Sequence, residues 1–130
     1  MERHPGIVVD LVDDLAIECI ARGHITADHV EHAQQALHHI FTDGQPASRF
    51  RVLFDGSQID SFARGLLGKW IRWWPAHIRY VARVAFVSRP GSLTTIATMF
   101  RHVLRQLPVA IFSDRRAAQS WLQSANDPCG

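Results

Sequence analysis

The sequence predicts an α/β fold in which helices pack on a mixed, mostly parallel β-sheet of about five strands. Three observations predict this class. Short apolar, β-branched segments alternate along the chain with segments whose apolar residues recur at helical spacing. The first two strand segments follow each other with no helix between them, which favours an antiparallel pair ahead of parallel strands. A length of 130 residues, with 47% hydrophobic and 20% charged residues, fits one folded domain with one core.

The elements are predicted one by one from periodicity and from the residues that separate them. Gly23 is expected to end the second strand, Thr26 to cap the first helix and Pro75 to stop the second helix, while Ser113 is expected to cap the last helix. The segment Val109–Phe112 is short and wholly apolar, which is typical of an internal parallel strand. The expected elements are strands at Ile7–Val12 and 15–22, a helix at 27–43, a strand at Phe50–Asp55, a helix at Ile59–Trp74, a strand at Tyr80–Val87, a helix at Leu93–Leu107, a strand at Val109–Phe112 and a helix at 114–125.

Composition excludes several classes of protein. No apolar run approaches the ~20 residues that a membrane-spanning helix requires, and the amino-terminal residues do not have the pattern of a secretory signal. Two cysteines, Cys19 and Cys129, form neither a disulfide framework nor a four-ligand zinc site. We therefore expect a protein of a reducing cytoplasm.

Charge is distributed unevenly along the chain. Residues 1–60 hold 10 acidic and 4 basic side chains, whereas residues 61–130 hold 2 acidic and 10 basic side chains. This asymmetry favours an anionic partner such as a lipid headgroup, a phosphate or an acidic protein surface. A fold whose two ends simply differ in charge explains it equally well.

Several motifs resemble one family. They are R-V-A-F-V-S at 83–88, P-V-A-I-F-S at 108–113, A-A-Q-S-W-L at 117–122, G-H-I-T-A-D-H-V at 23–30 and R-V-L-F-D at 51–55. Together they resemble the SpoIIAA-like branch of the STAS superfamily. The resemblance implies one STAS-like domain over 1–130, with a core at about 7–125 and a short flexible tail at 126–130. It also implies a regulatory protein that binds a partner or ligand and catalyses no reaction.

The resemblance further points to a regulatory loop. Anti-sigma factor antagonists of the superfamily carry a phosphorylatable serine after an aspartate, close behind the third strand. Here Asp60 and Ser61 come sooner after the strand than that pattern expects, and Phe62 follows them. We therefore expect Ser61 to be a poor kinase substrate. The residues that a protein partner would contact in this loop are Asp55, Ser57, Asp60 and Ser61.

The segment Ile59–Trp74 is the second candidate site. Its apolar stripe is wider than a surface helix needs, it contains Gly65 and Gly68, which disfavour a rigid helix, and Arg64, Lys69 and Arg72 flank it. The resemblance adds that the sheet is similar to that of CRAL-TRIO lipid-transfer domains, which implies an apolar ligand pocket. The segment is therefore expected to cover a lipid-like ligand, to lie on a membrane surface or to form a homodimer, and a packed core helix is the alternative.

The loop at 88–92, which follows a parallel strand and opens a helix, suits an anion. The alternative is an ordinary helix entry, with Ser92 as its cap and Arg89 in water. The candidate ligand-binding residues are Phe62, Leu66, Trp70, Trp73, Arg89 and Ser92.

Other chemistry is not expected. His32 and His39 share one solvated helix face without a third ligand, so no metal is predicted. The sequence has no G-x-S-x-G, Walker or G-x-G-x-x-G motif, so no nucleophile, nucleotide or other cofactor is predicted. Nucleic acid is an improbable partner because no reader motif accompanies the basic residues.

Overall fold

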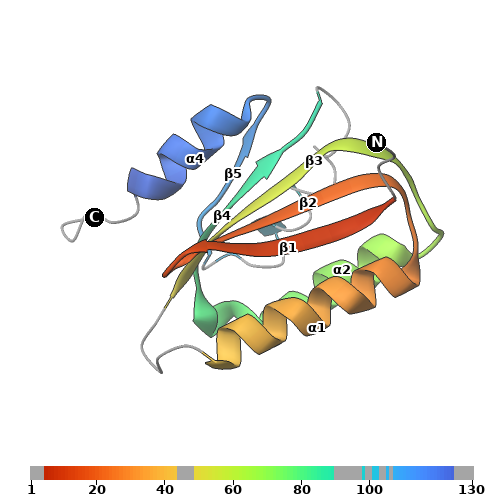
Figure 1. Cartoon of the computed structure of the whole chain (residues 1–130), viewed down its shortest axis with the longest axis horizontal. Helices are drawn as coiled ribbons and strands as arrows, with labels where there is room; N and C mark the ends of the chain where they lie inside the picture. Colours follow the sequence, from red (N-terminus) through yellow and green to blue (C-terminus); the bar gives the residue numbers. More distant parts are fainter. Residues whose placement is uncertain are drawn as a thin grey trace.

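The computed structural model describes residues 5–43, 49–89, 98, 101–102, 105 and 107–124. Five strands form one sheet in the order β1-β2-β3-β4-β5 (Figure 1). The elements are β1 (Gly6–Asp13), β2 (Ala16–Ile25), α1 (Ala27–Asp43), β3 (Phe50–Phe62), α2 (Leu66–Trp73), the 3-10 helix η1 (Trp74–Tyr80), β4 (Val81–Val87), β5 (Val109–Phe112) and α4 (Arg115–Gln123).

The pairing of the strands confirms the predicted fold class. β1 and β2 are antiparallel, and the pairs β2–β3, β3–β4 and β4–β5 are parallel. Helices α1 and α2 cover one face of the sheet, whereas α4 lies on the other (Figure 1). Among the described residues, no helix is long and apolar enough to span a membrane.

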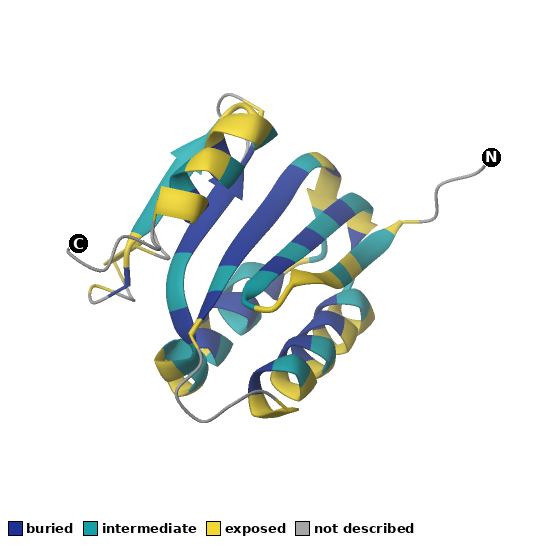
Figure 2. Ribbon diagram, turned by 60° about the vertical axis from the view of Figure 1, so that its left-hand side comes forward, coloured by how far each residue is buried: buried dark blue, intermediate teal, exposed yellow. Residues whose placement is uncertain are grey.

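Alternation along the strands sends side chains to both faces of the sheet, where the buried residues form two separate clusters. On the ribbon, the buried positions are concentrated in the central strands (Figure 2). Ile17, Cys19 and Ala21 are buried on the α1 side of β2. The core on that side is large and contains most of the buried aromatic side chains. The core under α4 is small; its buried members are Leu53, Ala85, Val87, Ala118 and Leu122.

The predicted cap of the first helix is confirmed by its hydrogen bonds. The Oγ1 of Thr26 accepts from the backbone N–H of His29 at 3.4 Å, and the Nδ1 of His29 accepts from the backbone N–H of Thr26 at 3.1 Å. His29 thus takes the position that glutamate has in a capping box.

The prediction that Gly23 ends the second strand is wrong, because β2 continues to Ile25. Gly23 has a φ of 74°, which glycine adopts without the steric cost of a side chain, and the register with β3 shifts directly after it. A Cβ at this position would lie 2.9 Å from the Cβ of Pro5. The glycine therefore bends the strand instead of ending it.

The prediction of a helix from Ile59 is also wrong, because β3 extends to Phe62 and α2 begins at Leu66. In the pairing with β2, Gly23 is opposite Ile59 and His24 is opposite Ser61, so Asp60 is an extra, bulged residue. The bulge lets Ile59 and Phe62, three residues apart, line the same cavity. A bulged strand thus reproduces helical spacing in the sequence.

Smaller differences concern the ends of elements. The helix α2 ends at Trp73, ahead of Pro75 as predicted, but the 3-10 helix η1 follows it directly, with Pro75 in its first turn, where the missing N–H costs nothing. The cap of α4 is Asp114 and not Ser113, since the Oδ2 of Asp114 accepts from the N–H of Ala117 at 3.1 Å. β5 has the predicted bounds but is the edge strand and is only half-buried. Most of the helix predicted at Leu93–Leu107 lies outside the described residues.

Candidate functional site

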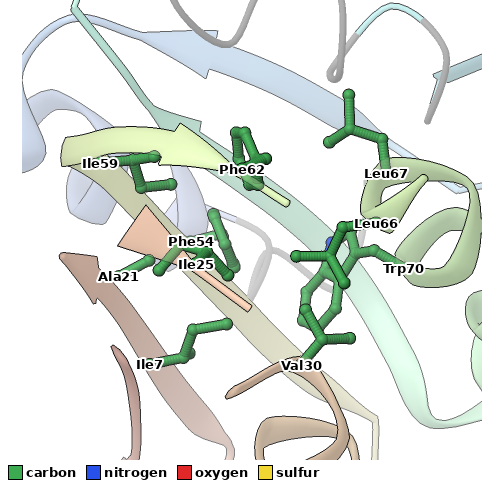
Figure 3. Close-up of a pocket in the computed structure, with 10 residues that line it drawn as sticks. All are labelled: Ile7, Ala21, Ile25, Val30, Phe54, Ile59, Phe62, Leu66, Leu67 and Trp70. Carbon is green, nitrogen blue, oxygen red and sulfur yellow. The ribbon is translucent and has the colours of Figure 1, made fainter. Parts of the chain in front are cut away.

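A small apolar cavity lies between α2 and the sheet (Figure 3). Its volume is about 20 Å³, which is room for about one water molecule. It lies where β2 and β3 end, which is where open parallel sheets bind ligands. The 10 lining residues, all apolar, are Ile7, Ala21, Ile25, Val30, Phe54, Ile59, Phe62, Leu66, Leu67 and Trp70.

Three of the predicted ligand-binding residues meet at this cavity. Phe62 comes from the end of β3, and Leu66 and Trp70 come from successive turns of α2 (Figure 3). Trp70 is 5% exposed, and its ring centroid lies 5.4 Å from that of Phe54. The inner face of α2 is therefore packed against the sheet.

Arg89 lies close to the cavity, whereas Trp73 does not line it. The Nη2 of Arg89 donates to the carbonyl oxygen of Ile59 at 2.8 Å, and the side chain of Ile59 lines the cavity. Arg89 itself is exposed, so a cationic group is available beside the apolar site. Ser92, the last of the predicted residues, lies outside the described residues.

The predicted regulatory loop is part of β3. Asp55 is buried, and its Oδ1 accepts from the backbone N–H of Ser57 at 3.0 Å and from the Ser57 hydroxyl at 2.7 Å. Its Oδ2 lies 4.0 Å from the Nη1 of Arg115 on α4. The contacts of Asp55 with Ser57 and Arg115 thus hold the start of the 55–61 segment in place.

The end of the segment is more accessible. Among the described residues, β4 pairs with β3 only as far as Asp55, while β2 pairs with β3 as far as Phe62. Asp60 and Ser61 are exposed, and the Oγ of Ser61 lies 2.6 Å from the Nδ1 of His24. The four residues of the predicted loop therefore divide into a fixed pair, Asp55 and Ser57, and an exposed pair.

A histidine pair that the sequence did not predict lies between α1 and η1. The Nδ1 of His38 on α1 is 3.2 Å from the Nε2 of His77 on η1, and the ring of His77 stacks on Trp73 at 3.8 Å. Burial lowers the pKa of His77, and the nearby His38 and Arg79 lower it further, against the opposing effect of the Trp73 carbonyl. These two histidines are far apart in sequence and meet only because η1 follows α2, so no local pattern reveals the pair.

The histidines that the sequence singled out, His32 and His39, are exposed on α1. Over the described residues there is no group of three or more histidine, cysteine or acidic side chains with the geometry to hold a metal ion.

Comparison with solved structures shows the fold. The chain is similar to an uncharacterized protein of the DUF3478 family from Shewanella loihica PV-4 that has a SpoIIAA-like fold, with 20% identity, a TM-score of 0.67 and coverage of 94% of this chain and 98% of the other. It is similar to the anti-sigma factor antagonist SpoIIAA in its unphosphorylated form, with 11% identity, a TM-score of 0.61 and coverage of 91% and 98%. An anti-sigma factor antagonist from Mycobacterium paratuberculosis gives 14% identity, a TM-score of 0.58 and coverage of 90% and 92%.

No curated protein sequence matches the chain. The SpoIIAA-like family model, in contrast, matches residues 16–123, from the start of β2 to the end of α4. This match confirms the resemblance that the motifs indicated. The chain belongs to the SpoIIAA-like family, and its fold is that of the STAS superfamily.

Proposed function

We propose that this protein is a regulatory module, not an enzyme, that binds a single-chain amphiphile between α2 and the sheet. The observation that carries this proposal is the wholly apolar cavity with the Arg89 guanidinium beside it. An apolar chain would replace the contacts between α2 and the sheet, and an anionic headgroup would pair with Arg89.

The volume of the closed cavity, about 20 Å³, means that α2 has to move before an alkyl chain can enter. Movement is favoured at the amino-terminal end of this short helix. Gly65 precedes it with a φ of 76°, and within the part of the chain that the structure describes no atom lies within 4 Å of a Cβ built there and no side chain caps the helix. Gly65 therefore places little steric restraint on the turn that precedes α2, while the N–H of Ala63 anchors the start of that turn to the carbonyl oxygen of Ile25 at 2.8 Å.

A weak ion pair joins α2 to α1. The Nζ of Lys69 lies 2.6 Å from the Oε1 of Glu31, and both side chains are substantially exposed. Exposed pairs of this kind contribute about 0–1 kcal/mol, so this pair would restrain α2 only slightly. Since Lys69 already has an acidic partner, Arg89 is the better candidate for the headgroup.

The proposal is tested by titrating the full chain with laurate below its micellar concentration while recording tryptophan emission. We expect a saturable shift, because Trp70 would exchange contacts with Phe54 for contacts with the alkyl chain. Arg89→Ala should weaken binding, whereas Arg72→Ala, which removes an exposed charge elsewhere on α2, should not. The absence of a saturable response to laurate and to longer fatty acids or lysophospholipids would overturn the proposal.

The second candidate function is regulation of a protein partner through the end of β3. Exposed Asp60 and Ser61 favour it, and two of the similar structures are anti-sigma factor antagonists. Under the amphiphile proposal we expect little phosphate on Ser57 or Ser61 in protein purified from its native host. Stoichiometric phosphorylation of either serine would favour the protein-partner function. Native mass spectrometry of the same sample would also reveal a bound lipid or a homodimer.

A further inference from the structure

The pair of His38 and His77 lies outside the apolar cavity and has no part in the function proposed above. It joins α1 to η1, with the Nδ1 of His38 3.2 Å from the Nε2 of His77. The ring centroids are 5.4 Å apart and the ring planes are nearly perpendicular, at 84°. Two nitrogen atoms from different elements thus point towards one another.

The ring of His77 is held in a defined orientation. Its Nδ1 lies 3.1 Å from the carbonyl oxygen of Trp73, and since a carbonyl only accepts, Nδ1 carries the proton. Stacking on Trp73, with an interplanar angle of 13°, fixes the plane of the ring. The lone pair of Nε2 is therefore directed towards His38. Metal-bound histidines are oriented in the same way, by donating the other ring N–H to a carbonyl.

The separation of the two rings suits a shared cation. With metal–nitrogen bonds of about 2.1 Å and the ring centroids kept 5.4 Å apart, the two nitrogens would subtend an angle of about 110° at the metal. This is a tetrahedral angle, and reaching it requires the nitrogens to separate by only about 0.3 Å. His38 is exposed and can make this small rotation. Its proton would move from Nδ1 to Nε2, so that both lone pairs face the cation and no proton is released.

A polar groove adjoins the pair, with a volume of about 590 Å³ and walls that include Glu31, Gln34, Gln35 and Thr42. Gln34 is only 8% exposed, and within the described part of the chain its Nε2 has no hydrogen-bond partner. An unsatisfied buried amide is rare. A water or anion bound to a cation at the histidines would supply an acceptor in this groove.

We propose that His38 and His77 form an open, two-histidine site for a first-row divalent cation such as Cu²⁺ or Zn²⁺. Imidazole nitrogens are the ligands that these cations prefer. Because the described residues offer no third protein ligand of the usual kinds, water or a small anion from the groove would fill the remaining positions.

The test uses the full chain, freed of metal with a chelator and then titrated with Cu²⁺. Trp73 stacks on His77, so a bound Cu²⁺ should quench its emission in a saturable, single-site manner. His38→Ala and His77→Ala should each weaken binding at least ~10-fold. His32→Ala, on the same helix and also exposed, is the matched control and should leave binding unchanged.

Calorimetry with Zn²⁺ on Trp73→Phe completes the test, because this variant should lose quenching but keep binding. Circular dichroism shows whether His77→Ala still folds; His38→Ala, at an exposed position, tests the site independently. The proposal is overturned when no saturable binding occurs at millimolar metal, or when His32→Ala weakens binding as much as His38→Ala does. The pair would then be only a hydrogen bond between two rings.

Discussion

The two faces of the sheet are held by different interactions. On one face, α4 packs Ala118 and Leu122 into a small core, and the guanidinium of Arg115 pairs with Glu18. On the other face, α2 leaves an apolar cavity, and its ion pair to α1 is exposed. The α2 face holds the larger core, and under the function proposed above it is also the face that opens for a ligand.

The largest expected effect is on stability, and it should differ between two tryptophans on the α2 face. Trp74 is 1% exposed and lies beyond α2, where it contacts Phe41, Trp70 and Trp73. Trp74→Ala should lower the free energy of unfolding by about 3–5 kcal/mol, as measured by urea denaturation. Trp70→Ala should cost less, because α2 can shift into the space. If Trp70→Ala lowered the free energy of unfolding as much as Trp74→Ala or more, α2 would be a fixed part of the core.

A matched pair of leucines compares the two faces directly. Leu122 on α4 is 7% exposed and Leu66 on α2 is 4% exposed. Leu122→Ala should cost about 2–5 kcal/mol without altering the laurate response. Leu66→Ala should cost less in the same denaturation experiment and should change the laurate affinity. A larger change in laurate affinity for Leu122→Ala than for Leu66→Ala would place the binding site on the α4 face and contradict the proposal.

The pH dependence of stability tests whether the Cys19 thiol is shielded from water between the sheet and α1. Burial, with the charges of Asp10 and Glu18 adding to it, raises the pKa of Cys19 from 9.0 to about 12. Above pH 9.0 the unfolded chain loses this proton and the folded chain keeps it, so stability falls by about 1.4 kcal/mol per pH unit. Cys19→Ala should abolish this part of the alkaline destabilisation. Identical pH profiles for the two proteins would show that the thiol is accessible.

The smallest effect concerns the ion pair between α1 and α2. Lys69→Ala should change stability by no more than about 1 kcal/mol, because both partners are exposed. It should tighten laurate binding modestly, since α2 loses a restraint in its closed position. Titration of Lys69→Ala beside the parent protein measures both quantities, and weaker binding would assign the lysine to the headgroup instead.

The fold was largely predictable because local patterns agree with the tertiary structure in most elements. The apolar stripe of α1 and the runs that form β4 and β5 are examples. The error at Ile59 has a physical cause, since the bulge at Asp60 makes residues three apart share a face.

The candidate site was predictable only in part. A single pattern in the sequence, apolar residues at helical spacing, reveals Phe62, Leu66 and Trp70. The opposite wall, with Ile7 and Val30, comes from elements far away in sequence, and the pair of His38 and His77 depends on a 3-10 helix that continues past Pro75.

Hydrogen–deuterium exchange of the full chain, with and without laurate, shows whether α2 moves to admit an amphiphile. We expect laurate to change the exchange of residues 62–73, which include α2 and the turn before it, and to leave that of α4 unchanged. Unchanged exchange at 62–73 under saturating laurate, or a change confined to α4, would contradict the proposal.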